Sequence, residues 1–88
     1  MELKHTVELM KSESYKDRFI AEYWQTKIRY EKLKTFCNNI EASMLSKNVN
    51  EPSHDCPLHL LQEQQAAMGK YLKMLEIRAI IENINLEV

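Results

Sequence analysis

The sequence predicts an all-α fold, in which a short N-terminal helix is followed by a long antiparallel helical hairpin, and it predicts that copies of the chain assemble into a homo-oligomer. The 88 residues include only one Gly and two Pro and are rich in Leu, Ile, Met, Glu, Lys and Gln, which favour helices over sheets. Two long stretches carry apolar side chains at the alternating three- and four-residue spacing of a helix–helix seam. A polar segment that holds both prolines separates the two stretches.

We interpret residues 1–88 as a single helical-hairpin domain. A chain of this length buries a small fraction of its surface, so its stability in isolation is marginal. The expected elements are a short helix over about residues 2–11, a long helix over about 14–45, a connector over 46–57 and a second long helix over about 57–82.

The first expected helix has Leu3, Val7 and Met10 at helical spacing, and it is too short to hold without packing. Ser12 and Ser14 can each cap a helix start, and Asp17, three residues after Ser14, completes an acidic form of a capping box. Without Pro or Gly the long helix would extend roughly 45 Å, which is long for a compact domain of this size. Its seam consists of Phe19, Tyr23, Thr26, Tyr30, Leu33, Cys37, Ile40 and Met44.

The connector, residues 46–57, is rich in helix breakers and capping residues. Asp55 or Cys56 is expected to cap the second helix, and Pro57 suits its first turn. The second seam consists of Leu58, Leu61, Gln65, Met68, Leu72, Leu75 and Ala79. Antiparallel pairing predicts five contacts: Met44 with Leu58, Ile40 with Leu61, Cys37 with Gln65, Leu33 with Met68, and Tyr30 with Leu72.

A further apolar row runs beside the second seam, and Ile20 and Trp24 lie beside the first. A single hairpin cannot cover so wide an apolar arc, so either the short N-terminal helix or other subunits must cover it, because large exposed apolar patches are rare on soluble monomers. We favour other subunits, in a homo-oligomer. This second row consists of Leu60, Ala67, Tyr71, Met74 and Ile81.

The formal net charge of −1 is too small for a duplex nucleic-acid footprint, so neither DNA nor RNA is an expected partner. Residues 1–47 hold nine Lys or Arg and seven acidic residues, a slight basic excess that suits a small anionic ligand. Cys37 and Cys56 are expected to be reduced thiols in a cytosol. With neither a signal peptide nor an apolar run of 18 residues, we expect a soluble protein that is not exported and has no membrane partner.

The connector and its neighbourhood offer nitrogen and sulfur atoms that could bind a metal, from His54, Cys56 and His59 and from Cys37 nearby. These residues lack the paired spacings that are typical of zinc sites. We therefore favour capping and connector roles for them and expect no metal. The glycines that would form a tight oxyanion turn beside a nucleophile are absent, so we expect no enzyme and no cofactor.

Cations and flat aromatic rings gather near the start of the long helix, a combination that stacks bases and neutralises phosphates. The alternative interpretation is that Trp24 belongs to an interface core and that the cations form a solvated face. The candidate ligand-binding residues are Lys11, Tyr15, Arg18, Trp24 and Lys27.

Five segments carry a resemblance to a known family: residues 15–19 (YKDRF), the seam around Leu33, residues 64–68 (QQAAM) and the pairs at 71–72 and 78–79. They resemble the helical-hairpin domain of phage anti-CBASS sponges, which the related anti-Thoeris sponges share. The resemblance spans roughly residues 14–82, and the chain looks close to the type found in T-even phages. It implies a homohexamer that sequesters cyclic dinucleotides of the 3′,3′-cGAMP type without cleaving them, in the cytoplasm of the infected bacterium, and so blocks CBASS signalling.

The resemblance also implies which positions bind ligand. Alignment through Leu33 places the family's phosphate-binding Lys on Trp24, with Lys27 as the nearest cation, and its stacking aromatic near Leu9 or Met10. Tyr15 takes that stacking role if the N-terminal segment differs in length. The Thr of a second, trinucleotide pocket falls on Thr26, but its Arg falls near Leu61 or Gln62, so trinucleotide binding is not expected. The alternative function is a coiled-coil interaction module or inhibitor that acts on a host protein.

Overall fold

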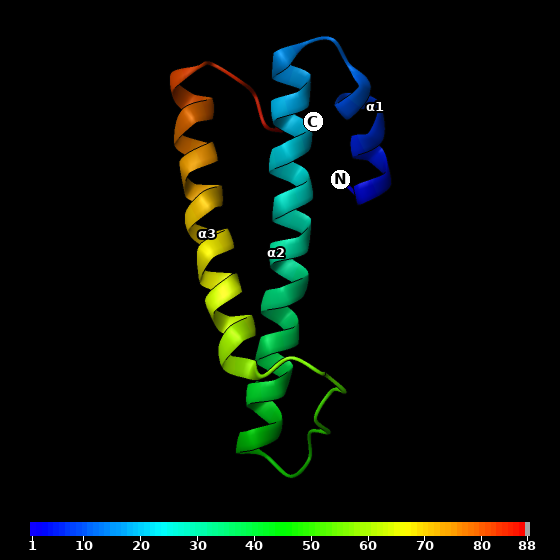
Figure 1. Cartoon of the computed structure of the whole chain (residues 1–88), viewed down its shortest axis with the longest axis vertical. Helices are drawn as coiled ribbons and strands as arrows, with labels where there is room; N and C mark the ends of the chain where they lie inside the picture. Colours follow the sequence, from blue (N-terminus) through cyan, green and yellow to red (C-terminus); the bar gives the residue numbers. More distant parts are fainter. Residues whose placement is uncertain (88) are drawn as a thin grey trace.

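A computed structural model describes residues 1–87 of the chain. It contains a 3₁₀ turn η1 (Leu3–His5), a short helix α1 (Thr6–Lys11) and two long helices, α2 (Tyr15–Leu45) and α3 (Leu58–Ile81) (Figure 1). The predicted all-helical class, with a short N-terminal helix and two long helices packed together, is confirmed. None of the helices in residues 1–87 has the length and apolar character that a membrane crossing requires.

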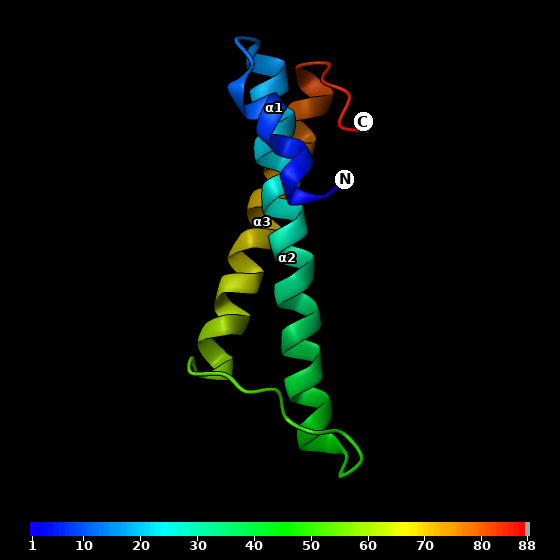
Figure 2. The same cartoon turned by 90° about the vertical axis from the view of Figure 1, so that its right-hand side faces the viewer.

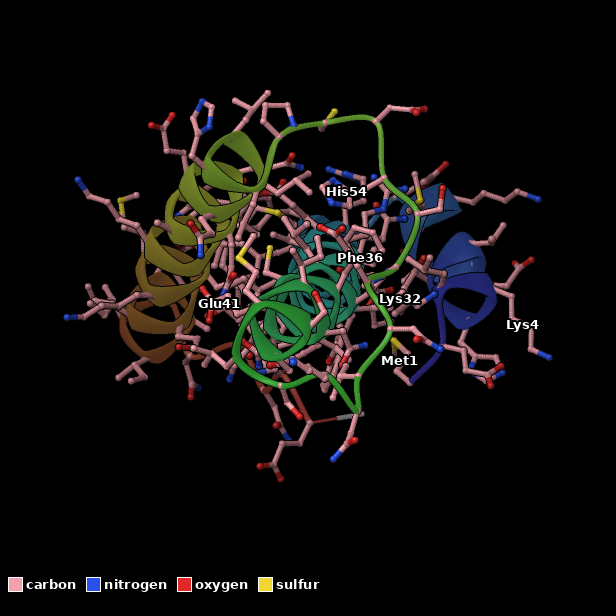
Figure 3. All side chains as sticks on the ribbon, turned by 90° about the horizontal axis from the view of Figure 1, so that it is seen from below. Met1, Lys4, Lys32, Phe36, Glu41 and His54 are labelled. Carbon is pink, nitrogen blue, oxygen red and sulfur yellow. The ribbon has the colours of Figure 1, made fainter. Side chains whose placement is uncertain are left out.

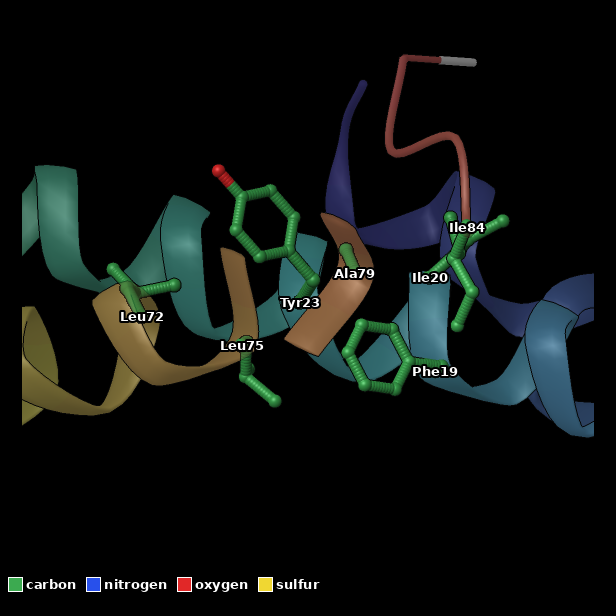
Figure 4. Packing of buried hydrophobic residues seen from close by; sticks show 7 residues of the cluster. All are labelled: Phe19, Ile20, Tyr23, Leu72, Leu75, Ala79 and Ile84. Atoms are coloured by element: carbon green, nitrogen blue, oxygen red, sulfur yellow. The ribbon is translucent and has the colours of Figure 1, made fainter. Parts of the chain in front are cut away.

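The two long helices run antiparallel, and α1 packs on the side of α2 that faces away from α3 (Figures 1 and 2). The molecule is elongated, with extents of 50 × 25 × 20 Å. The two long helices cross at an angle, so they overlap near the start of α2 in Figure 2 and near the connector in Figure 1. The main core lies where the start of α2 meets the end of α3 and is made of Phe19, Ile20, Tyr23, Leu72, Leu75, Ala79 and Ile84 (Figure 4).

Most of the predicted seam faces inward. Every seam residue of α3 is buried or half-buried, and so are the seam residues of α2 apart from Met44, which is 64% exposed. Tyr30 lies against Gly69, one turn before its expected partner Leu72: a Cβ atom on Gly69 would lie 3.2 Å from the Tyr30 ring. Seam spacing therefore identified the packed faces of both helices.

The inward face of α1 differs from the one that the spacing of Leu3, Val7 and Met10 suggested. Val7 and Met10 are exposed, whereas Thr6 is buried. The Thr6 hydroxyl donates to the Leu3 carbonyl at 2.7 Å and accepts from the Gln25 amide at 2.9 Å. Burial of this polar side chain is tolerated because both of its hydrogen-bonding roles are fulfilled.

The predicted capping box of Ser14 and Asp17 is wrong. Ser14 is the N-cap residue of α2, but its side chain makes no capping bond. Instead, Ser12 Oγ donates to Asp17 Oδ2 at 2.7 Å and accepts from the Ser14 backbone N–H at 3.0 Å. One hydroxyl thus ties the turn between α1 and α2 to the first turn of α2.

The prediction that Asp55 or Cys56 caps the second helix is also wrong, because Pro57 is the N-cap residue of α3 and lies just before its first turn. The Pro57 carbonyl accepts from the backbone N–H groups of Leu60 and Leu61. The connector folds back beside α2, where the ring of His54 meets the ring of Phe36 edge-on at 6.1 Å (Figure 3).

After α3 the chain turns back across α2, a feature that the sequence analysis did not anticipate. Asn83 has a positive φ of 56°, the Asn83 N–H donates to the Ile80 carbonyl, and the Ile84 N–H donates to the Ala79 carbonyl. This bond pattern with a left-handed residue is a Schellman motif. It directs Ile84 into the core and brings the Leu86 carbonyl to the indole N–H of Trp24 at 2.7 Å.

Candidate functional site

Tyr15, at the first position of α2, meets the last turn of α3. Its hydroxyl donates to Glu82 Oε1 at 2.8 Å and accepts from Arg78 Nη2 at 2.7 Å. Arg78 Nε also donates to Glu82 Oε2 at 3.1 Å. Three polar side chains from opposite ends of the sequence therefore form a closed triangle of hydrogen bonds, which we call the Tyr15 corner.

The electrostatics of the Tyr15 corner match this geometry. The hydrogen bond from Tyr15, followed by that from Arg78, lowers the pKa of the Glu82 carboxyl. The same bond to Glu82 raises the pKa of the Tyr15 phenol. The Arg78 guanidinium also lies 5.0 Å from the centroid of the Phe19 ring. A charged carboxylate and a neutral phenol are thus the stable protonation states here.

A second feature is an open pocket of about 250 Å³ in the groove between α1 and α2. Arg18 is held there by a 2.8 Å hydrogen bond from its Nη1 to the Ser12 carbonyl. Glu22, on the same wall, accepts a hydrogen bond from the Tyr71 hydroxyl of α3. The pocket is lined by Met10, Arg18, Glu22 and Gln25.

The five predicted ligand-binding residues do not share one surface of a single chain. Tyr15 belongs to the Tyr15 corner and Arg18 to the pocket, while Lys11 is exposed at the end of α1. Arg18 and Lys27 are nine residues apart on α2, or two and a half turns, so they point to opposite sides of the helix. No single phosphate can contact both cations of one chain.

The remaining predicted residues have structural partners. The indole of Trp24 is half-buried between the C-terminal tail and Tyr23, whose ring it meets edge-on at 5.4 Å. Lys27 forms an ion pair of 3.7 Å with Glu31. The Thr26 hydroxyl donates to the Glu22 carbonyl at 2.9 Å, one turn back along α2. Whether any of them binds a ligand stays a prediction.

Sequence reasoning did not select Arg78 and Glu82, although the structure joins them to Tyr15. Their i,i+4 spacing at the end of a helix is a signal for an ion pair, but it says nothing about Tyr15, which is 63 residues from Arg78 in the chain. Only the antiparallel register of α2 and α3 brings Tyr15 to this pair.

The histidine and cysteine residues considered as metal ligands are not gathered into a site. His54 Nδ1 lies 2.7 Å from the Cys56 carbonyl oxygen, and its Nε2 lies 3.2 Å from Glu51 Oε1. Cys37 is buried on α2, whereas Cys56 is exposed. Across residues 1–87, no group of three or more His, Cys, Asp and Glu side chains is arranged to hold a metal ion.

Comparison with known proteins identifies the family. No curated protein and no solved structure matches the chain significantly. The family model described as Sequestin matches residues 13–81, which include α2, the connector and α3. This match confirms the resemblance to phage anti-CBASS sponges, while the T-even type stays a prediction. The family name denotes sequestration of a ligand, which indicates a binding protein rather than an enzyme. The chain belongs to the Sequestin family.

Proposed function

We propose that this protein is a sponge that binds and sequesters cyclic dinucleotides of the 3′,3′-cGAMP type without cleaving them, and thereby blocks CBASS signalling in the cytoplasm of an infected bacterium. The family match over residues 13–81 is the observation that carries this proposal. The function requires only tight binding, because a messenger held by the sponge is not free to activate its effector.

The cations and aromatic rings near the start of α2 supply chemistry suited to such a ligand. Tyr15 is 48% exposed and presents a flat ring for a nucleobase, and Arg18 lines the pocket between α1 and α2. Met10, which lies near the family's stacking position because the alignment places that position near Leu9 or Met10, also lines this pocket. Stacking and charge-assisted hydrogen bonds together provide the affinity that sequestration needs.

We propose that the complete site forms between copies of the chain, in a homohexamer as the resemblance implies. The pocket of about 250 Å³ is smaller than most sites for drug-sized ligands, which measure roughly 300–1,000 Å³. Arg18 and Lys27 point to opposite sides of α2, so both can face one ligand only if a second copy supplies one of them. A twofold interface would also present equivalent groups to the two halves of a cyclic dinucleotide.

The surface of α3 supports this assembly. The second apolar row, for which we favoured other subunits over the short N-terminal helix as the cover, is exposed along its whole length in the single chain. An apolar stripe that extends over most of a long helix favours a protein partner. The exposed residues of this α3 row are Leu60, Ala67, Tyr71, Met74 and Ile81.

The experiment that tests the proposal is depletion followed by recovery. Purified protein is incubated with a panel of cyclic di- and trinucleotides, the free ligand is measured, and the protein is then destroyed by heat or protease. Depletion of 3′,3′-cGAMP followed by its return as the intact molecule supports a sponge. Loss of the nucleotide after the protein is destroyed indicates hydrolysis, and absence of depletion contradicts the proposal.

The α3 row is also compatible with the alternative function, an interaction module that acts on a host protein. Thermal unfolding separates the two functions. A ligand that binds only the folded state at 100 times its Kd stabilises that state by about 2.7 kcal/mol, so a sponge melts at a higher temperature with cyclic dinucleotide present. An interaction module shows no such shift.

A further inference from the structure

We propose that the Tyr15 corner is a phosphate-binding point of the ligand site, and that in the free protein the Glu82 carboxylate occupies the place of a phosphate group. This inference rests on the proposed function and adds Arg78 to the residues that contact the nucleotide. It also assigns to Glu82 the role of an internal competitor for the ligand.

The geometry of the donors supports a phosphate at this position. Tyr15 O–H and Arg78 Nε–H already converge on the two oxygens of one carboxylate, at 2.8 and 3.1 Å. A phosphate presents the same kind of oxygen pair to these two donors, and the planar guanidinium fork suits bidentate contact with it. The hydrogen bond of 2.7 Å between Arg78 and Tyr15 can persist when Glu82 leaves, so the two donors stay together.

The charges favour exchange of one anion for another. Besides the hydrogen bonds from Tyr15 and Arg78, the positive charges of Arg78 and Lys16 also lower the pKa of Glu82. The Glu82 side chain is 32% exposed and that of Arg78 51%, which leaves both partners accessible to solvent. An ion pair this exposed is weak, and a phosphate that binds between subunits with less water competes well with it.

The surroundings of the Tyr15 corner fit the remainder of a nucleotide. Tyr15, whose ring lies 6.1 Å from the buried Phe19 ring at 59°, is 48% exposed and presents aromatic surface beside the phosphate point. Arg78 follows Tyr71 and Met74 and precedes Ile81 at steps of three or four residues, so it lies within the α3 row. A second copy that covers this row would enclose the cation, and a phosphate would then supply its counter-charge.

Calorimetric titration of the full chain with 3′,3′-cGAMP tests the inference. Arg78→Ala is expected to weaken binding about tenfold or more, because it removes charge-assisted hydrogen bonds. Glu82→Gln is expected to tighten binding about threefold or more, because the competing charge is gone. The matched control is Glu41→Gln, which makes the same change near the other end of α2, about 39 Å along the helix from Tyr15, and should leave affinity unchanged. Circular dichroism verifies that each variant is folded.

Three results separate the possible conclusions. Unchanged affinity in a folded Arg78→Ala variant, or weaker binding in Glu82→Gln, overturns the inference and leaves the sponge function intact if the wild type binds. Failure of the wild type to bind any cyclic dinucleotide overturns the sponge function. In that event a titration with inorganic pyrophosphate tests whether the Tyr15 corner binds phosphate groups at all. Binding of pyrophosphate that is lost in Arg78→Ala would show that the corner is an anion-binding site. Absence of pyrophosphate binding would overturn that assignment.

Discussion

Gly69, the one glycine of the chain, illustrates how two effects at a single residue oppose each other. Alanine at a helix interior is favoured over glycine by about 1 kcal/mol. A Cβ atom here would lie 3.2 Å from Tyr30 Cε1, however, so the tyrosine ring must shift by a few tenths of an ångström. We therefore expect Gly69→Ala to change the free energy of unfolding by less than about 0.5 kcal/mol in the wild type.

A double-mutant cycle separates these two effects. In a Tyr30→Ala background the obstructing ring is absent, and Gly69→Ala should stabilise the protein by about 1 kcal/mol. Urea unfolding of the four proteins measures the difference. An equal effect of Gly69→Ala in both backgrounds would show that the Tyr30 ring imposes no constraint on this position.

His54 makes the attachment of the connector depend on pH. The Cys56 carbonyl, followed by the Glu51 carboxylate, raises the pKa of its imidazole above 6.5, and the nearby charge of Asp55 acts in the same direction. Because the pKa of His54 is higher in the folded state than in the unfolded state, protonation of His54 stabilises the folded state. This stabilisation is complete below pH 6.5 and is lost as the pH rises through the raised pKa.

An NMR titration of the histidine ring protons tests this prediction. The His54 resonance should titrate above pH 6.5, and Glu51→Gln should move its pKa part of the way back because the Cys56 carbonyl remains. A wild-type His54 that titrates at or below pH 6.5 would contradict the assignment of the two acceptors.

Among the elements, the C-terminal turn determines whether the tail packs on α2. Ile84 is 7% exposed within the core, and Ile84→Ala should destabilise the protein by about 2–5 kcal/mol because it leaves a cavity. Ile80, four residues earlier and 81% exposed, provides the matched control, since Ile80→Ala should cost less than about 0.5 kcal/mol. Similar unfolding midpoints in urea for the two variants would show that the tail does not contribute to the core.

The helices could be predicted from the sequence because each long seam repeats its spacing over many turns, and one misplaced residue does not obscure it. The helix caps could not be predicted, since Ser12 and Ser14 are chemically alike and only the path of the turn determines which of them forms a hydrogen bond with Asp17. Asn83, two residues after the last apolar residue of α3, was a readable stop signal. Its consequence, the contact of Trp24 with Leu86, depends on tertiary packing.

The same distinction holds for the candidate site. Composition and clustering drew attention to the start of α2, where the structure has both the Tyr15 corner and the pocket with Arg18. Local sequence could not pair Tyr15 with Arg78, because that contact depends on the register between two helices joined by the connector. Nor does spacing alone show that Trp24 binds the C-terminal tail, because the tail carries no periodic signal.

At the scale of the whole molecule, assembly is the property on which the proposed site depends, and the α3 row is where it can be tested. Met74→Glu places a charge in the middle of this row, where burial against another copy would be costly. Ile80→Glu introduces the same charge at an exposed apolar residue about 120° around the helix from Met74. Both substitutions lie at exposed positions, so both variants should remain folded.

We expect Met74→Glu to dissociate the oligomer and abolish uptake of 3′,3′-cGAMP, and Ile80→Glu to retain both properties. Light scattering after size-exclusion chromatography gives the mass, and calorimetry gives the binding. A wild type with the mass of a single chain, or a Met74→Glu variant with unchanged mass, would exclude the α3 row as the subunit interface. Dissociation with binding retained would place the complete ligand site within one chain, because the pocket and the Tyr15 corner would then suffice without a second copy.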